Sequence, residues 1–346
     1  MRYKTLLAFL ALSIGAVFCQ SSENERVAIQ FYQFREYAKA ELLLEKQYKL
    51  KPQKFYPYLF NTYMELRKYE SAINITKSLL RGKNSKNKDY KYNLGLAYYK
   101  NDDTLKSSKH WRELNDWTAN SEFEVSKLLK KYSQLRQWSL MESLILKSHK
   151  KAKKTNTFAT VLIDAYVNQG KYNEAITNSI QLLDAATTDY MRVYSGFTFL
   201  SESKEAMRIM DKKVFARLNK DPNSKKWNDI AMHMSMTLKD YEQALMLARA
   251  YEKRTKGQGN KVYHVSEIAM SDNFFDIAID GYDYLIAGTG TYAKLGYDRK
   301  LKARLLRLEK ERMKDSSEIK KLNDDFLNYF SKYGFSTNTA DIQLLF

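Results

Sequence analysis

The sequence contains little cysteine, proline or glycine for its 346 residues, with one, three and twelve of them respectively. So few prolines allow long uninterrupted helices, because an interior proline removes a helical hydrogen bond and clashes with the preceding turn. A single cysteine excludes a disulfide scaffold. Alternating β-branched runs between turn residues, which would predict strands, are also scarce. The sequence therefore predicts an all-α protein.

Long apolar runs are equally scarce, and the one clear run lies at the N-terminus. After Arg2 and Lys4, thirteen residues from Leu6 to Phe18 are mainly apolar. This length is typical of a secretory signal peptide and is shorter than the roughly 20 residues of a membrane-spanning helix. We therefore expect residues 1–19 to be a signal peptide.

The expected cleavage site lies between Cys19 and Gln20, which would leave a protein exported to the bacterial periplasm or associated with the cell envelope. A lipid anchor on Cys19 is one alternative, although a lipobox has a small residue where this chain has Phe18. An uncleaved membrane tether is another. Cleavage after Cys19 would remove the only thiol.

Charge is strongly one-sided, with a formal net charge of +18. Basic chains often bind nucleic acid, but the expected export argues against such a partner. Anionic glycans or lipid headgroups of the envelope would suit the charge better. Lysine-rich helices with solvated faces explain the same composition without any ligand.

A small residue, usually alanine, recurs three places after an aromatic residue. Between positions 40 and 278 the mean spacing is 34 residues, and a fixed period of this size is typical of a repeated helix–turn–helix unit. The pairs are Tyr37/Ala40, Tyr69/Ala72, Tyr172/Ala175, Tyr241/Ala244 and Phe275/Ala278, and the intervening small-residue slots hold Ser107, Met141 and Ala206.

The residues around these positions resemble the tetratricopeptide repeat (TPR). LIDAYVNQGKYNEAI at 162–176 contains the large–small–tyrosine pattern of a first helix, a glycine stop and the aromatic–x–x–alanine opening of a second helix. YNLGLAYYKND at 92–102 repeats the first pattern, and RKYESAI, KDYEQAL and NFFDIAI repeat the second. The resemblance implies a right-handed superhelical solenoid of antiparallel helix pairs and a non-enzymatic role in binding proteins.

This resemblance divides residues 20–288 into about eight helix pairs, at 22–52, 53–86, 87–118, 121–154, 155–187, 188–220, 224–256 and 258–288. The third, fourth and sixth pairs match the pattern poorly, so we expect irregular geometry there. Residues 289–346 predict a longer helix pair, 292–314 and 317–333, and the start of an uncapped helix. Its apolar stripe, Ile342, Leu344, Leu345 and Phe346, would need cover from further repeats or a partner.

Catalytic and metal-binding patterns are not found in the sequence. The four histidines, His110, His149, His233 and His264, are far apart and have no second ligand at metal-binding spacing. Nucleophile-elbow, zinc-protease and phosphate-loop motifs are also missing. We therefore expect no catalytic, metal or cofactor site, no cofactor and no enzymatic activity.

The resemblance implies that the first helices line a concave groove that holds a partner peptide or protein. Transferring the repeat register gives ten candidate contact residues, namely Asn61, Met64, Tyr92, Leu96, Tyr99, Asp164, Val167, Asn168, His233 and Met236. The leading hypothesis is an envelope scaffold that binds a protein in this groove. Alternatives are a basic surface for anionic glycan or lipid headgroups, or the repeat portion of a longer secretion or signalling component.

Overall fold

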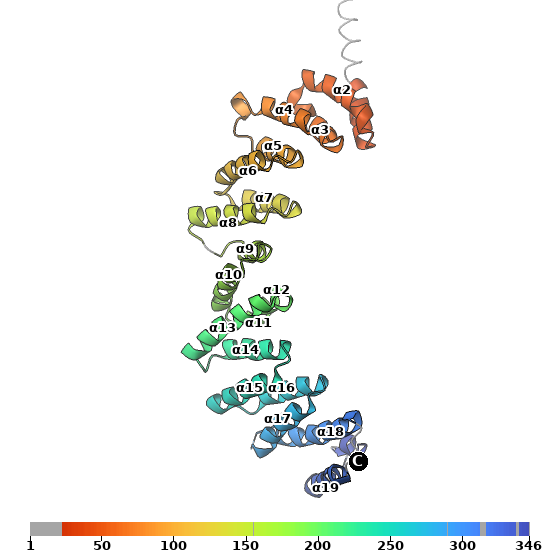
Figure 1. Cartoon of the computed structure of the whole chain (residues 1–346), viewed down its shortest axis with the longest axis vertical. Coiled ribbons are helices and arrows are strands. Elements are labelled where there is room, and N and C mark those ends of the chain that lie inside the picture. The colour runs from red at the N-terminus through yellow and green to blue at the C-terminus, as the bar shows by residue number, and fades with distance from the viewer. Residues whose placement is uncertain (1–22, 155, 289, 312–315, 337–338, 346) are drawn as a thin grey trace, which may run out of the picture. The chain divides into compact units, whose positions relative to one another are not determined.

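The computed structural model describes residues 23–154, 156–288, 290–311, 316–336 and 339–345, and every regular element in these ranges is a helix. The expected signal peptide, its cleavage site and Phe346 lie outside the described residues. The chain divides after Gln169 into two compact units, and Figure 1 labels most of their helices. No helix among the described residues has the length and apolar character needed to cross a membrane.

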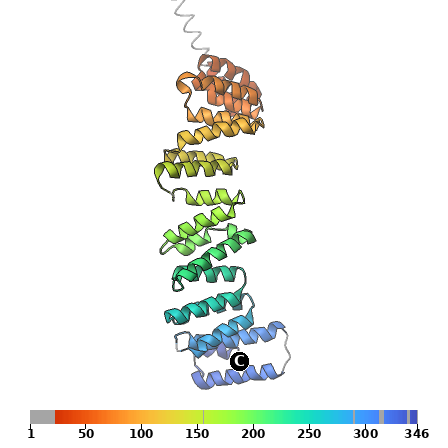
Figure 2. The ribbon, with the colours of Figure 1, turned by 60° about the vertical axis from the view of Figure 1, so that its left-hand side comes forward.

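The first unit is a succession of helix pairs in which neighbouring helices run antiparallel (Figure 2). Consecutive helices from α2 to α6 pack on one another, as do α7 with α8 and α8 with α9. Its helices are residues 23–33, α2 (Tyr37–Leu50), α3 (Pro52–Glu65), α4 (Tyr69–Leu79), α5 (Lys88–Lys100), α6 (Thr104–Thr118), α7 (Glu122–Gln134), α8 (Trp138–Ala152) and α9 (Ala159–Val167), with a 3-10 turn at Gly82–Asn84.

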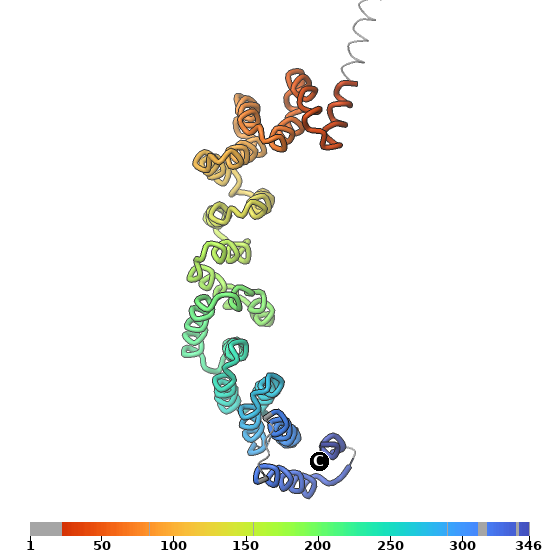
Figure 3. Tube along the Cα trace, turned by 45° about the vertical axis from the view of Figure 1, so that its right-hand side comes forward, coloured from red at the N-terminus to blue at the C-terminus, as the bar shows by residue number. Residues whose placement is uncertain are grey.

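The second unit continues with the same type of packing, and the trace in Figure 3 shows its helices in sequence. From α13 onward each helix packs on the next, up to α19. The helices are α10 (Tyr172–Ala185), α11 (Tyr190–Ser195), α12 (Phe199–Glu202), α13 (Lys204–Lys220), α14 (Lys225–Thr237), α15 (Tyr241–Thr255), α16 (Asn260–Ser271), α17 (Phe275–Ala287), α18 (Ala293–Glu311), α19 (Ser316–Tyr333) and α20 (Ala340–Gln343).

The turn inside a helix pair has a recurring backbone geometry. Five positions before the small-residue slot of seven helix pairs, one residue adopts the left-handed conformation, with φ between 53° and 70°. At the six turns where this residue is not glycine, the next N–H donates to the carbonyl five residues back, as from Gln137 to Tyr132 at 2.9 Å. This is the Schellman arrangement that ends helices. The left-handed residues are Arg35, Arg67, Asp102, Arg136, Gly170, Lys239 and Asn273.

The sixth pair departs from this pattern. Its first helix is broken into α11 and α12, and the turn to α13 places Ser203 in an extended conformation with φ of −129°. The Ser203 hydroxyl accepts a hydrogen bond from the N–H of Ala206. At the break, the buried ring of Phe197 contacts Tyr194 and Phe199. An irregularity therefore occurs in one of the three pairs where the repeat pattern is weak.

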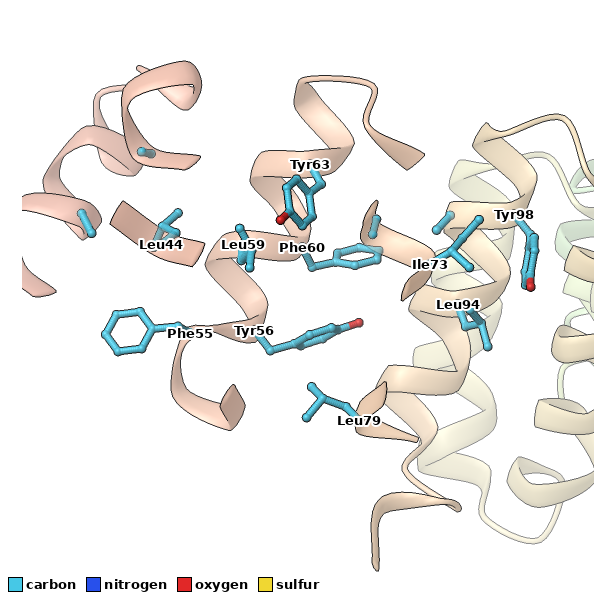
Figure 4. Packing of buried hydrophobic residues seen from close by; sticks show 14 residues of the cluster. Leu44, Phe55, Tyr56, Leu59, Phe60, Tyr63, Ile73, Leu79, Leu94 and Tyr98 are labelled. Carbon is cyan, nitrogen blue, oxygen red and sulfur yellow. The ribbon is translucent and has the colours of Figure 1, made fainter. Parts of the chain in front are cut away.

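The small-residue slots lie in the core. All eight, from Ala40 to Ala278, are at most 2% exposed, including Ser107 and Met141. Figure 4 shows how side chains of successive helices fill the space between them, with Leu44 of α2, Phe60 of α3 and Ile73 of α4 in one cluster. The slots therefore act as contact points at which two helices approach closely.

The C-terminal residues pack differently from the free helix expected from the sequence. Helix α20 is a single turn, Ile342 is buried, and Leu345 packs against the same cluster as Tyr329 and Leu301. Leu344 is 87% exposed. Of the described members of the expected apolar stripe, Ile342 and Leu345 are therefore covered within the chain, and Leu344 is exposed.

Candidate functional site

Two pockets lie between successive first helices of the first unit. One, of about 330 Å³, is bounded by α5, the end of α6 and α7, and is called the α5–α7 pocket below. The other, of about 380 Å³, lies between α7, α8 and α9 and is called the α7–α9 pocket. Because ligand sites are concave, these pockets are the natural candidates within this unit.

The α7–α9 pocket combines an apolar floor with a polar rim. Leu129 and Met141 are buried beneath it, while Trp138, Phe158 and Val161 are half-buried on its walls. The rim consists of Ser126, Lys130, Ser133, Asp164 and Asn168. An apolar pocket with a few polar groups at its edge suits a side chain of a bound peptide.

Two of the residues expected from the sequence, Asp164 and Asn168, meet on this rim. The Asn168 side-chain amide donates to the Asp164 backbone carbonyl at 2.8 Å, which holds the amide beside the last turn of α9. The Asp164 carboxylate is exposed, yet partial burial by its apolar surroundings raises its pKa. The third residue expected on this helix, Val167, is half-buried and does not line the pocket.

Phe158 has an unusual backbone. It precedes α9 with φ 60° and ψ 24°, the left-handed region. A bulky residue rarely adopts this conformation, which costs about 1–2 kcal/mol for an L-residue. Its ring forms part of the pocket wall. Sequence analysis missed Phe158 because the left-handed conformation cannot be recognised from an aromatic residue type.

Tyr92, expected on the groove surface, is largely buried. Its side chain is 8% exposed and stacks on Trp111 with ring centroids 6.0 Å apart, and burial raises its pKa to about 12. The repeat register points it to the groove side, but the large Trp111 ring, which fits against Gly95, draws Tyr92 into the core. Leu96 and Tyr99 of the same helix are half-buried.

Tyr92 nevertheless forms the inner wall of the α5–α7 pocket, whose rim is basic. The Lys131 ammonium lies 4.3 Å from the centroid of the Tyr92 ring. Four lysines line the pocket, Lys86, Lys88, Lys127 and Lys131, and two acidic residues, Asp89 and Glu124, pair with three of them at 3.3–3.8 Å. The site therefore retains a local excess of positive charge.

On α3, the two expected residues differ in accessibility. Asn61 is exposed, and its amide donates to the Tyr32 hydroxyl at 3.1 Å. Met64 is half-buried and packs against the hydrophobic cluster formed by buried residues between Ala28 and Tyr98. Asn61 is therefore the more accessible of the two.

The remaining expected residues, His233 and Met236, belong to α14 of the second unit. Both are half-buried. The His233 ring meets Tyr194 edge-on at 5.4 Å, and burial, with a smaller effect from His264, lowers its pKa. Sequence analysis missed a larger pocket in this unit, of about 640 Å³ between α16 and α18, lined by Met270, Phe275, Lys302 and Leu306 among others.

The described residues contain no group of three or more His, Cys, Asp or Glu side chains arranged to hold a metal ion. The two pockets of the first unit present apolar contacts, amides and charged side chains.

No protein-family model and no curated protein matches the chain. Among solved structures, the complex of Naa15 and Naa10 bound to HypK aligns with 91% of this chain at 15% identity and a TM-score of 0.37, and this chain covers 52% of the matched chain, about half its length. A tetratricopeptide repeat protein from Parabacteroides merdae aligns with 78% at 12% identity and a TM-score of 0.35. The C-terminal part of a TPR repeat-containing protein from Cytophaga hutchinsonii aligns with 78% of this chain at 14% identity and a TM-score of 0.35.

These likenesses are distant, so the fold assignment rests on the molecule's own geometry. Antiparallel helix pairs, buried small residues at a 34-residue spacing and recurring Schellman turns together define a TPR-like helical repeat protein. The predicted all-α fold class is confirmed. The right-handed superhelix stays a prediction.

Proposed function

We propose that this chain is a non-enzymatic scaffold of the bacterial cell envelope that binds a peptide segment of a partner protein along the first helices of its first unit. The observation that supports it most is the α7–α9 pocket, in which Asp164 and Asn168 stand on the rim of an apolar cavity. The α5–α7 pocket lies at the preceding junction of first helices, so an extended peptide would meet both. Export is inferred from the N-terminal sequence alone.

Co-purification from the envelope fraction tests this proposal. The triple variant Asn61→Ala, Asp164→Ala, Asn168→Ala removes three exposed polar groups without disturbing the core. We expect the parent to retain a protein partner that the triple variant loses. Tyr92 is unsuitable for this test, because removing a buried stacked ring would destabilise the unit.

A matched control replaces polar residues that do not line the pockets, namely the exposed Asn173 and Asp221 and the half-buried Asn178. This control should retain the partner. A parent that captures no protein, or a triple variant that captures as much as the parent, would refute the groove as the binding surface.

The basic α5–α7 pocket supports a second candidate function, the binding of anionic glycan or lipid headgroups. Exposed charges are screened beyond roughly 8 Å at physiological ionic strength, so such binding would weaken strongly with salt. The lysine run near position 150 supports this candidate less, because Lys147 and Lys154 pair with Asp116 and Glu122. Binding to anionic vesicles that persists at high salt would exclude this candidate.

A further inference from the structure

We infer that the α7–α9 pocket selects a peptide with an apolar side chain next to a lysine or arginine. This inference rests on the proposed function and specifies its partner. The apolar side chain would enter the cavity between Trp138, Phe158 and Val161, and the neighbouring cation would pair with the Asp164 carboxylate at the rim.

Asp164 is suited to an external cation because no cation of the described residues pairs with it. Its carboxylate makes no ion pair or side-chain hydrogen bond there, and its raised pKa is due to burial alone. Elsewhere in the first unit, carboxylates such as Glu25 and Asp116 pair with lysines. Asp164 therefore leaves one negative charge available on the rim of the cavity.

The apolar part of the site is built independently of this charge. Leu129 and Met141 form a buried floor, and Phe158 completes the wall despite its left-handed backbone. Such strain persists where the surrounding structure requires it and is commonest at binding sites. The cavity of about 380 Å³ is large enough for one leucine or phenylalanine side chain.

The net charge of the protein makes this inference easy to distinguish from non-specific attraction. A chain with a net charge of +18 attracts acidic peptides through its overall field. A preference for a basic peptide therefore opposes that field and requires a local acidic group at the site. Among the described residues that line this pocket, Asp164 is the only carboxylate and Lys130 the only cation, so Asp164 alone can attract a basic peptide there.

The test measures fluorescence anisotropy of four labelled twelve-residue peptides with the full chain. The first has a central leucine flanked by lysines, the second the same leucine flanked by glutamates, and the third the leucine flanked by glutamines. The fourth has the lysines but a central serine. We expect the first peptide to bind about tenfold or more tightly than each of the others, which corresponds to about 1.4 kcal/mol.

Two substitutions at Asp164 link this preference to the pocket. Asp164→Asn should weaken binding of the lysine peptide about fivefold to tenfold, and Asp164→Lys should reverse the preference toward the glutamate peptide. Asp211→Asn is the matched control, because Asp211 also has a pKa raised by burial but belongs to α13 and does not line this pocket. The control should leave peptide binding unchanged.

Thermal unfolding of each variant shows that folding is intact, since removing a partly buried charge at either aspartate should not lower the melting temperature. Tighter binding of the glutamate peptide, equal binding of all four, or no binding of any overturns the inference. Loss of the envelope partner in the triple variant would then still support the proposed function with a partner of other chemistry. Failure of both experiments would remove the proposed function as well.

Discussion

At the scale of single residues, the turns between paired helices show how far this chain departs from an ideal repeat. The left-handed turn position favours glycine, because a side chain there meets its own backbone. Only Gly170 fits this preference among the seven such turns, and the others hold arginine, aspartate, lysine or asparagine. Each of these non-glycine residues retains some backbone strain.

Introducing a glycine at one such turn and removing the glycine at another should therefore change stability in opposite directions. Arg136→Gly is expected to raise the free energy of unfolding by about 0.5–1 kcal/mol, because relief of about 1–2 kcal/mol of strain exceeds the extra entropy of the unfolded chain. Gly170→Ala should lower it by about 1 kcal/mol. No atom lies within 4 Å of a Cβ built at Gly170, so this loss would be purely conformational.

Urea denaturation monitored by circular dichroism measures both changes. Lys239→Gly, at the equivalent turn of the second unit, is the matched control and should behave like Arg136→Gly. A lower midpoint for Arg136→Gly would mean that contacts of the arginine side chain outweigh the backbone strain.

At the scale of helices, the connection between α15 and α16 depends on one buried acid. Glu252 is 5% exposed and accepts hydrogen bonds from the N–H groups of Gly259 and Lys261, at 3.1 and 2.7 Å. It thereby satisfies donors at the start of α16, where a negative charge also favours the helix dipole. Gly257 leaves the space, since a Cβ there would lie 1.7 Å from the Glu252 carboxylate.

Glu252→Ala should consequently destabilise the second unit by about 2–4 kcal/mol, because two hydrogen bonds to a charged acceptor are lost and two N–H groups remain poorly solvated. Glu252→Gln retains one acceptor oxygen and should have roughly half the effect. The free energy of unfolding from urea titration checks both values. Equal stability of the alanine variant and the parent would show that water replaces the carboxylate.

The connection at Glu252 also illustrates what the sequence could and could not predict about individual elements. Gly257 and Gly259 indicate a turn, but nothing in the local sequence identifies Glu252 as the acceptor for the next helix. Tyr92 was placed in the groove by the repeat register, and the structure buries it because Trp111 and Gly95 meet on the same side. Period and residue type predict which helices form, whereas non-local packing decides which side chains remain accessible.

At the scale of the molecule, the regular spacing of the small-residue slots was sufficient to predict the all-α repeat fold, because close helix contacts require small residues at a fixed spacing. The pockets could not be predicted in the same way. The α7–α9 pocket combines Trp138 of α8, Phe158 of the turn before α9 and Asp164 of α9, and its shape depends on the left-handed conformation of Phe158. A periodic pattern contains no information about such an exception.

Charge also acts on the whole molecule, and it predicts how stability depends on pH. Neighbouring lysines lower the pKa of Glu25, through Lys51 and Lys54, and of Glu113, through Lys91. A lowered pKa in the folded state contributes stability above the ordinary value, 4.5 for glutamate, and this contribution is lost as pH falls through the lower folded value. Burial raises the pKa of Asp164, Asp211 and Asp298, which has the opposite effect.

On acidification from about pH 7 to about pH 3, the melting temperature should therefore change little at first and then fall. As the pH first falls below neutral, the aspartates with raised pKa values become protonated, which removes the unfavourable burial of their charge. At lower pH the lysine-paired glutamates become protonated. The positive charge then rises above its neutral-pH value of +18, so that self-repulsion grows. Circular dichroism melting curves at each pH measure this profile, and added salt should restore part of the loss by screening the repulsion.

Glu25→Gln is the matched variant: it should be less stable than the parent at neutral pH and equally stable at the acidic limit. A melting temperature that rises steadily down to the acidic limit would show that the buried aspartates, and not the lysine pairs, dominate the electrostatics of this chain.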